Sequence, residues 1–187
     1  MTRILVLLGS LRAASVNRQL AEAAAELAPQ GIHVELFDRL GELPHYNEDI
    51  DTTDVAEPVE ALREVSGQSD GVLVITPEYN ATIPGALKNA IDWLSRPYGN
   101  GALNGKPLAV IGTSLGSYGG TWAHDDTRKS FAIAGARVID SIRLSIPSKT
   151  LAGAHPRDHP DTIAKLTAAL TELVAEVGPD PRSRDAQ

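Results

Sequence analysis

The chain has 187 residues, 42% of them hydrophobic and 22% charged, with a formal net charge of −7 and no cysteine. This length and composition suit one soluble domain with a sizeable core, and the acidic balance argues against non-specific nucleic-acid binding. The lack of cysteine excludes a thiol nucleophile, a disulfide framework and cysteine-ligated zinc or iron–sulfur sites.

The first predicted element is an apolar strand over residues 4–8, which leads through a turn rich in hydroxyls into a helix. The apolar run is too short for a signal peptide or a membrane span, so we expect a cytoplasmic protein that does not bind a membrane. Its residues do not alternate apolar with polar, which is typical of a central parallel strand buried on both faces. Apolar residues then recur with helical spacing at positions 20, 23, 24 and 27.

Strands and helices continue to alternate along the rest of the chain. We predict further strands over residues 32–37, 72–76, 108–113 and 137–146, with helical patterns at residues 87–94 and 163–177. Such alternation predicts a parallel sheet with helices on both faces. Five strands in this length favour an α/β flavodoxin-like three-layer sandwich of strand order 2-1-3-4-5 over a larger Rossmann domain. We expect one domain over residues 1–178 and a disordered tail over residues 179–187.

Three loops follow the carboxyl ends of the predicted strands, where sheets of this kind bind their ligands. They are GSLRAASVN at residues 9–17, TPEYNATIPG at residues 76–85 and GTSLGSYGG at residues 112–120. We expect the three loops to meet and to form the site.

The first loop offers hydroxyls and a guanidinium at the start of a helix. The free amides and the dipole of a helix amino terminus favour an anion, and phosphate matches the additional donors of Ser10, Arg12, Ser15 and Asn17. The alternative is that Ser15 only caps the helix and Arg12 is solvated. From the turn alone, the two interpretations have about equal weight.

The three loops also resemble a known family. GSLRAASVNRQLA is similar to the GSxRxxSxNxxLA signature of NADPH-dependent FMN reductases, a flavodoxin-like group that includes quinone, azo-dye and chromate reductases. TPEYNATIPGALKNAIDWLSRP and GKPLAVIGTSLGSYGG resemble the second and third signatures of that family. The likeness runs from about the first strand to the fourth helix.

The resemblance implies a role for each loop in binding FMN. The phosphate would be held by Ser10, Arg12, Ser15 and Asn17, with help from the Val16 amide. The isoalloxazine ring would lie along Pro77, Glu78, Tyr79 and Asn80, largely against backbone atoms. The other side of the ring would be closed by Ser114 and neighbouring glycines, including Gly116.

The implied activity is the transfer of hydride from NADPH or NADH to bound FMN and then of electrons to a small acceptor. Quinones, azo compounds, free flavin and chromate are the acceptors expected, and no side chain is expected to be catalytic because the flavin carries the redox chemistry. Family members are commonly homodimers or homotetramers, so Tyr98 and residues 44–51 are candidate subunit contacts. A non-enzymatic flavodoxin-like electron carrier is an alternative.

A serine hydrolase is the second alternative, because GTSLG at residues 112–116 matches the G-x-S-x-G nucleophile elbow. Asp125, Asp126 or Asp140 followed by His155 or His159 would give the expected chain order of a triad. Against this, few strands precede Ser114, no oxyanion loop of the HGGG type is present, and the anion-binding turn would have no purpose.

The remaining polar and aromatic residues of note are interpreted structurally. His124, Asp125 and Asp126 are expected on a solvated helix face, so no metal site is predicted, and His33 and His45 are expected at the surface. Trp93 is expected in the core. Family members often have proline where this chain has Leu115, and the stretch TWAHDDTRKSF also departs from the family pattern.

Overall fold

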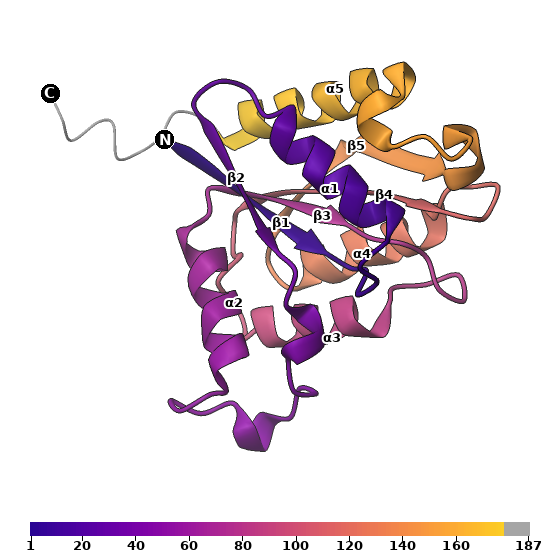
Figure 1. Cartoon of the computed structure of the whole chain (residues 1–187). Helices are drawn as coiled ribbons and strands as arrows, with labels where there is room; N and C mark the ends of the chain where they lie inside the picture. Colours follow the sequence, from indigo (N-terminus) through magenta and orange to yellow (C-terminus); the bar gives the residue numbers. More distant parts are fainter. Residues whose placement is uncertain (178–187) are drawn as a thin grey trace, which may run out of the picture.

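A five-stranded parallel sheet forms the centre of the protein, whose computed structural model describes residues 1–177 (Figure 1). The strands are β1 (Thr2–Leu8), β2 (Ile32–Phe37), β3 (Gly71–Ile75), β4 (Pro107–Ser114) and β5 (Arg137–Pro147). Their order in the sheet is β2-β1-β3-β4-β5, and every neighbouring pair is parallel. The predicted α/β fold and its strand order are therefore confirmed. The predicted tail, residues 179–187, lies outside the described residues.

Helices cover both faces of the sheet. They are α1 (Val16–Glu26), α2 (Glu57–Gln68), α3 (Gly85–Leu94), α4 (Thr121–Ile133) and α5 (Pro160–Val177). One core cluster joins the sheet to α1 and α5, and the other joins it to α2, α3 and α4. Trp93 lies in the second cluster, as predicted. None of the helices within residues 1–177 has the length and apolar character needed to cross a membrane.

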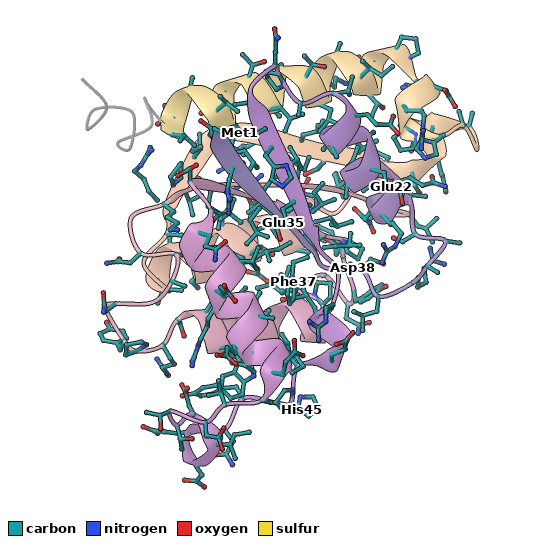
Figure 2. All side chains as sticks on the ribbon, turned by 60° about the vertical axis from the view of Figure 1, so that its left-hand side comes forward. Met1, Glu22, Glu35, Phe37, Asp38 and His45 are labelled. Carbon is teal, nitrogen blue, oxygen red and sulfur yellow. The ribbon has the colours of Figure 1, made fainter. Side chains whose placement is uncertain are left out.

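The strands differ in burial according to their place in the sheet. All five residues of the central strand β3 are buried, which explains its uninterrupted apolar sequence. The edge strand β2 instead alternates, with His33 and Glu35 exposed and Ile32, Val34 and Leu36 half-buried. Figure 2 labels Glu35 and Phe37 on this strand and His45 in the loop beyond. His33 and His45 are both exposed, as predicted.

The pairing of β4 with β5 contains one irregularity. Leu108 pairs with Val138 but Val110 pairs with Arg143, so residues 139–142 bulge opposite Ala109. At the bulge, Arg128 of α4 bridges the two strands. Its Nη2 donates to the carbonyl of Val110 on β4 at 2.7 Å and to the carbonyl of Ile142 on β5 at 3.2 Å.

Candidate functional site

The three predicted loops meet at the carboxyl edge of the sheet around a cleft of about 490 Å³. The first loop lines it with Ser10, Arg12, Ser15, Val16 and Asn17, and the second with Pro77, Glu78 and Tyr79. The third loop adds Thr113, Ser114 and Leu115, and a fourth segment adds Ser148, which follows β5. Two residues predicted for the site, Asn80 and Gly116, do not line this cleft.

The first loop is shaped by a close approach of two strands. The Gly9 amide donates to the carbonyl of Ile75 at 2.8 Å, and a Cβ atom on Gly9 would collide with the Thr76 side chain. Glycine is therefore needed at this position, where β1 ends and the turn begins.

Ser15 begins α1 as its N-cap. Its Oγ accepts a hydrogen bond from the Asn17 amide at 3.2 Å, so the capping interpretation of this residue is correct. Because a hydroxyl both donates and accepts, the Ser15 hydrogen is still available to a ligand. Capping and anion binding are thus compatible.

Arg12 lies in the same loop with an exposed side chain. Within residues 1–177, its guanidinium makes no hydrogen bond or ion pair. The next arginine along, Arg18, is instead paired with Asp38 at 2.9 Å. Arg12 is therefore the cation of this loop that is available to an anion.

Asn17 locks the start of α1 onto β4. Its Nδ2 donates to the carbonyl of Thr113 at 2.9 Å, and its Oδ1 accepts from the Thr113 amide at 2.9 Å. The side chain is 4% exposed. Asn17 therefore fixes the first loop against the third, and its predicted contact with a phosphate would have to come from the remaining amide hydrogen.

The second loop leaves the sheet at the buried Pro77 and then makes a tight turn. The amides and carbonyls of Tyr79 and Thr82 bond reciprocally at 3.3 and 3.1 Å, while Asn80 and Ala81 have φ angles of +51° and +61°. Two left-handed residues in succession are strained for side chains other than glycine, and such strain is concentrated at functional sites. The turn presents Tyr79, which is 48% exposed, at the cleft.

Glu78 connects this loop to α4. Its carboxylate accepts a hydrogen bond from the Ala123 amide at 3.2 Å, in the first turn of the helix. The N-cap of α4 is Gly120, at a φ of +97°, which has no side chain to cap with. Glu78 thus supplies, from another loop, the hydrogen-bond acceptor that the N-cap lacks. Its negative charge also interacts favourably with the positive end of the helix dipole.

The interpretation of His124 as a solvated residue is wrong. The side chain is 0% exposed, with Nε2 at 3.0 Å from the carbonyl of Thr76 and Nδ1 at 2.7 Å from Oγ of Ser145. A carbonyl only accepts, so Nε2 carries the hydrogen and Nδ1 of the neutral ring accepts from Ser145. Burial lowers the pKa of His124 from 6.5 to about 4, which keeps the ring neutral.

The acidic neighbours of His124 are paired within the fold. Asp125 accepts from Arg128 at 2.9 Å and from Arg143 at 2.8 Å, and Asp126 accepts from the Thr82 hydroxyl at 2.7 Å. Among residues 1–177, no group of three or more side chains of the kinds that bind metals is gathered in one place.

The arrangement needed for a serine hydrolase is not formed. No hydrogen bond within the described part of the chain joins Ser114 to a histidine. His155 accepts from Arg157 and lies 4.0 Å from Glu22, and His159 bonds with Thr162. The nucleophile-elbow match at residues 112–116 therefore does not lead to a triad.

The cleft also contains hydroxyls that the fold leaves unused. Oγ1 of Thr113 and Oγ of Ser148 are both buried and have no hydrogen-bond partner. Together with Arg12, Ser15 and the start of α1, they form a set of donors without matching acceptors. This chemistry fits a ligand with several acceptor oxygens, such as a phosphate, because an unsatisfied buried polar group is costly unless a ligand meets it.

Residues 2–150 match the family model of the NADPH-dependent FMN reductases. The chain belongs to this family. It is 42% identical over 151 residues to a quinone reductase of Pseudomonas putida, covering 81% of this chain and 78% of the relative. It is 46% identical over 126 residues to a 2-hydroxy-1,4-benzoquinone reductase of a Burkholderia species, covering 67% of this chain and 68% of the relative.

A solved structure agrees with this assignment over nearly the whole chain. A flavoenzyme NAD(P)H:(acceptor) oxidoreductase from Paracoccus denitrificans is 35% identical, with a TM-score of 0.84, and the match covers 95% of this chain and 97% of that one. As a member of the NADPH-dependent FMN reductases, the protein is an oxidoreductase with a flavodoxin-like fold.

Proposed function

We propose that this FMN reductase holds FMN in the 490 Å³ cleft and uses NADPH or NADH to reduce quinones or other small acceptors. The observation that supports this best is the meeting of all three family motifs around a cleft in which several donors, among them Arg12, Thr113 Oγ1 and Ser148 Oγ, have no partner within residues 1–177. The relatives named as quinone reductases support the acceptor class.

The phosphate end of the cofactor would lie at the start of α1. Arg12 supplies a free charge, Ser10 and Ser15 supply hydroxyls, and the Val16 amide lies in the first turn of the helix. Charge-assisted hydrogen bonds of this kind are stronger than neutral ones and select an anion over a neutral group. Asn17 would act mainly by holding this loop against Thr113.

The ring end would lie between the second and third loops. Pro77, Glu78 and Tyr79 line one side of the cleft, and Ser114 and Leu115 line another. The carboxylate of Glu78 is already used on α4, so this residue would meet the ring with its backbone. Asn80 and Gly116 would contribute by shaping their turns, since neither lines the cleft.

When bound, FMN would supply the redox chemistry, and the residues of this chain bind it, orient it and limit the access of water. The mouth of the cleft has an apolar character, because Tyr79 is 48% and Leu115 is 77% exposed there. A flat apolar acceptor such as a benzoquinone matches such a surface.

We also propose that the protein self-associates as a homodimer or a homotetramer. Tyr98 is 83% exposed, Tyr118 is 67% exposed and Trp122 is 54% exposed, which is unusual for large aromatic residues unless a partner or ligand covers them. Light scattering at micromolar concentration should give at least twice 19.8 kDa. A monomer with full activity would contradict the proposed self-association.

The experiment that tests the proposed function is an anaerobic reduction. The protein loaded with FMN should lose the yellow flavin absorbance when NADPH or NADH is added, and 1,4-benzoquinone should restore it with repeated turnover. An electron carrier would keep its colour in the presence of either nucleotide. That result, or a failure of the protein to retain FMN, would contradict the proposal.

A further inference from the structure

The segment after β5 brings a polar side chain to the cleft that none of the three family motifs contains. Ser148 follows Pro147, the last residue of β5, and it lines the cleft together with the phosphate-side residues Ser10 and Ser15. Its Oγ is buried and has no hydrogen-bond partner within the described part of the chain.

The register of the sheet sets the position of Ser148 beside the third loop. Thr113 pairs with Ile146, and Ser114 pairs with Pro147, so Ser148 comes directly beyond the end of this pairing. Asn17 ties Thr113 to the start of α1 through two hydrogen bonds. Strand β4 is therefore the only element between Ser148, at the end of β5, and the start of α1.

The chain that follows Ser148 lies on the same side of the sheet as α1. Arg157, in the short helical turn Pro156–Asp158, donates to Glu26 of α1 at 2.8 Å. In Figure 1 the chain then continues into α5, which shares a core cluster with α1. Ser148 thus approaches the cleft from the side of α1, away from the second loop and α4.

Thr113 provides a second, independent observation at the same place. The residue is 3% exposed, and its Oγ1 is also buried without a partner, although its amide and carbonyl are both bonded to Asn17. Two unpartnered hydroxyls in one small region are costly to the ligand-free protein, and each can donate to an acceptor that enters the cleft.

We infer that Ser148 and Thr113 complete the phosphate site by donating hydrogen bonds to the phosphate of FMN. This inference rests on the proposed function, because it assumes that FMN is the ligand of the cleft. A phosphate has enough acceptor oxygens to take these two hydroxyls in addition to Arg12 and the start of α1. The phosphate would then be enclosed by residues from both β4 and β5, besides the motif that follows β1.

Ser148→Ala and Thr113→Val test the inference in a way that a purely structural role would not satisfy. Each variant removes a hydroxyl that has no internal partner, so the thermal unfolding temperature of the FMN-free protein should stay the same or rise. The affinity for FMN should fall about tenfold or more, as expected when a hydrogen bond to a charged group is lost. The affinity for riboflavin, which lacks the phosphate, should stay within about twofold of wild type.

Two further variants provide matched controls in the same segment. Thr150→Ala removes a hydroxyl that donates to the carbonyl of Pro147 at 2.7 Å and does not line the cleft. It should leave the affinity for FMN unchanged, whereas Ser148→Thr, which keeps the hydroxyl, should preserve most of the affinity.

The affinities are measured by the quenching of flavin fluorescence on titration with protein. If wild type binds FMN and Ser148→Ala binds it equally well, the inference is wrong while the proposed function stands. An equal loss for FMN and riboflavin would assign Ser148 to the ribityl chain and would also overturn it. If wild type does not bind FMN at all, the proposed function itself fails.

Discussion

The two flanks of the cleft differ in how far their polar groups are already paired within the fold. On the α1 flank, formed by the first loop with Thr113 and Ser148, the guanidinium of Arg12 and two buried hydroxyls have no partners within the described residues. On the α4 flank, formed by the second loop, α4 and the adjoining part of β5, Glu78 and His124 are bonded to backbone or side chains.

This difference indicates that the α1 flank mainly binds the ligand and that the α4 flank mainly holds the loops in position. Polar groups that are left unpartnered inside a cleft are costly to the ligand-free fold, so they indicate where a ligand supplies the missing bonds. Polar groups that are already paired hold the loops in position. We therefore expect changes on the α4 flank to alter mainly stability, and changes on the α1 flank to alter mainly the affinity for FMN.

The largest effect on stability is expected from Arg128→Met. The guanidinium is 5% exposed and bonds to two backbone carbonyls at the bulge of β5, as well as to Asp125. Its removal leaves the two carbonyls without this donor, and an unsatisfied buried acceptor costs about 1–3 kcal/mol. Asp125 is 47% exposed and keeps its ion pair with Arg143, so the loss of its contact with Arg128 adds little. Urea unfolding measures the change, with Lys129→Met as the matched control on the exposed side of the same helix. Equal stability of the two variants would contradict the role assigned to Arg128.

His124 should make stability depend on pH. Burial lowers its pKa from 6.5 to about 4, so between these pH values the unfolded state takes up a proton that the folded state does not. Stability therefore falls as the pH is lowered through this window, by a total of about 3 kcal/mol from this residue. Arg128 lowers the pKa further and Asp125 raises it, but both effects are smaller than that of burial.

The measurement compares wild type with His124→Gln, whose side-chain amide can still donate to the carbonyl of Thr76 but does not titrate. The free energy of unfolding is followed from pH 7 to pH 4, where the carboxylates contribute alike in both proteins. We expect the wild type to lose more stability than the variant over this range. Parallel curves would show that His124 is not held neutral by the fold.

The smallest effect on stability is expected from removing the cap of α1. Comparing Ser15 with Ser10 distinguishes the capping of the helix from the binding of FMN on the same flank. Ser15→Ala removes the acceptor of the Asn17 amide and should cost about 1 kcal/mol of stability. Ser10 lies outside the helix and is 3% exposed, but its hydroxyl makes no hydrogen bond within residues 1–177, so Ser10→Ala should cost less stability than Ser15→Ala. Both variants should weaken the binding of FMN. If Ser10→Ala proved as destabilising as Ser15→Ala, the capping role would not account for the result.

The features that could be predicted from the sequence are those set by a short, continuous run of residues. The apolar runs that form β1, β3 and β4 are uninterrupted because these strands are buried on both faces, so they could be found directly. The positions of the three loops then followed from the strand order. Most of the predicted site residues line the cleft, although Asn80 lies in the turn itself and Gly116 lies off the cleft.

What could not be predicted depends on contacts between distant segments. His124, Thr127, Arg128 and Phe131 have the helical spacing of a buried face, but three of them are polar, and the expectation that His124 is solvated took no account of this spacing. The distant partners of His124 and Arg128 lie on β4, on β5 and at Thr76, directly after β3. The bulge of β5 beside Arg128 has no signature in the sequence. Ser148 was missed for a related reason, since only the register of β5 against β4 brings it to the cleft.

The most direct test of the central claim is a titration of FMN and riboflavin against wild type and Arg12→Ala. If the first loop holds the phosphate, wild type should prefer FMN by roughly 3–4 kcal/mol, or about two to three decades in affinity. Arg12→Ala should remove a large part of this preference while hardly changing the binding of riboflavin. Arg18→Ala, whose guanidinium is already paired with Asp38, is the matched control and should keep the preference. An equal loss of affinity for both flavins would mean that Arg12 supports the fold instead of the phosphate, and would contradict this account of the cleft.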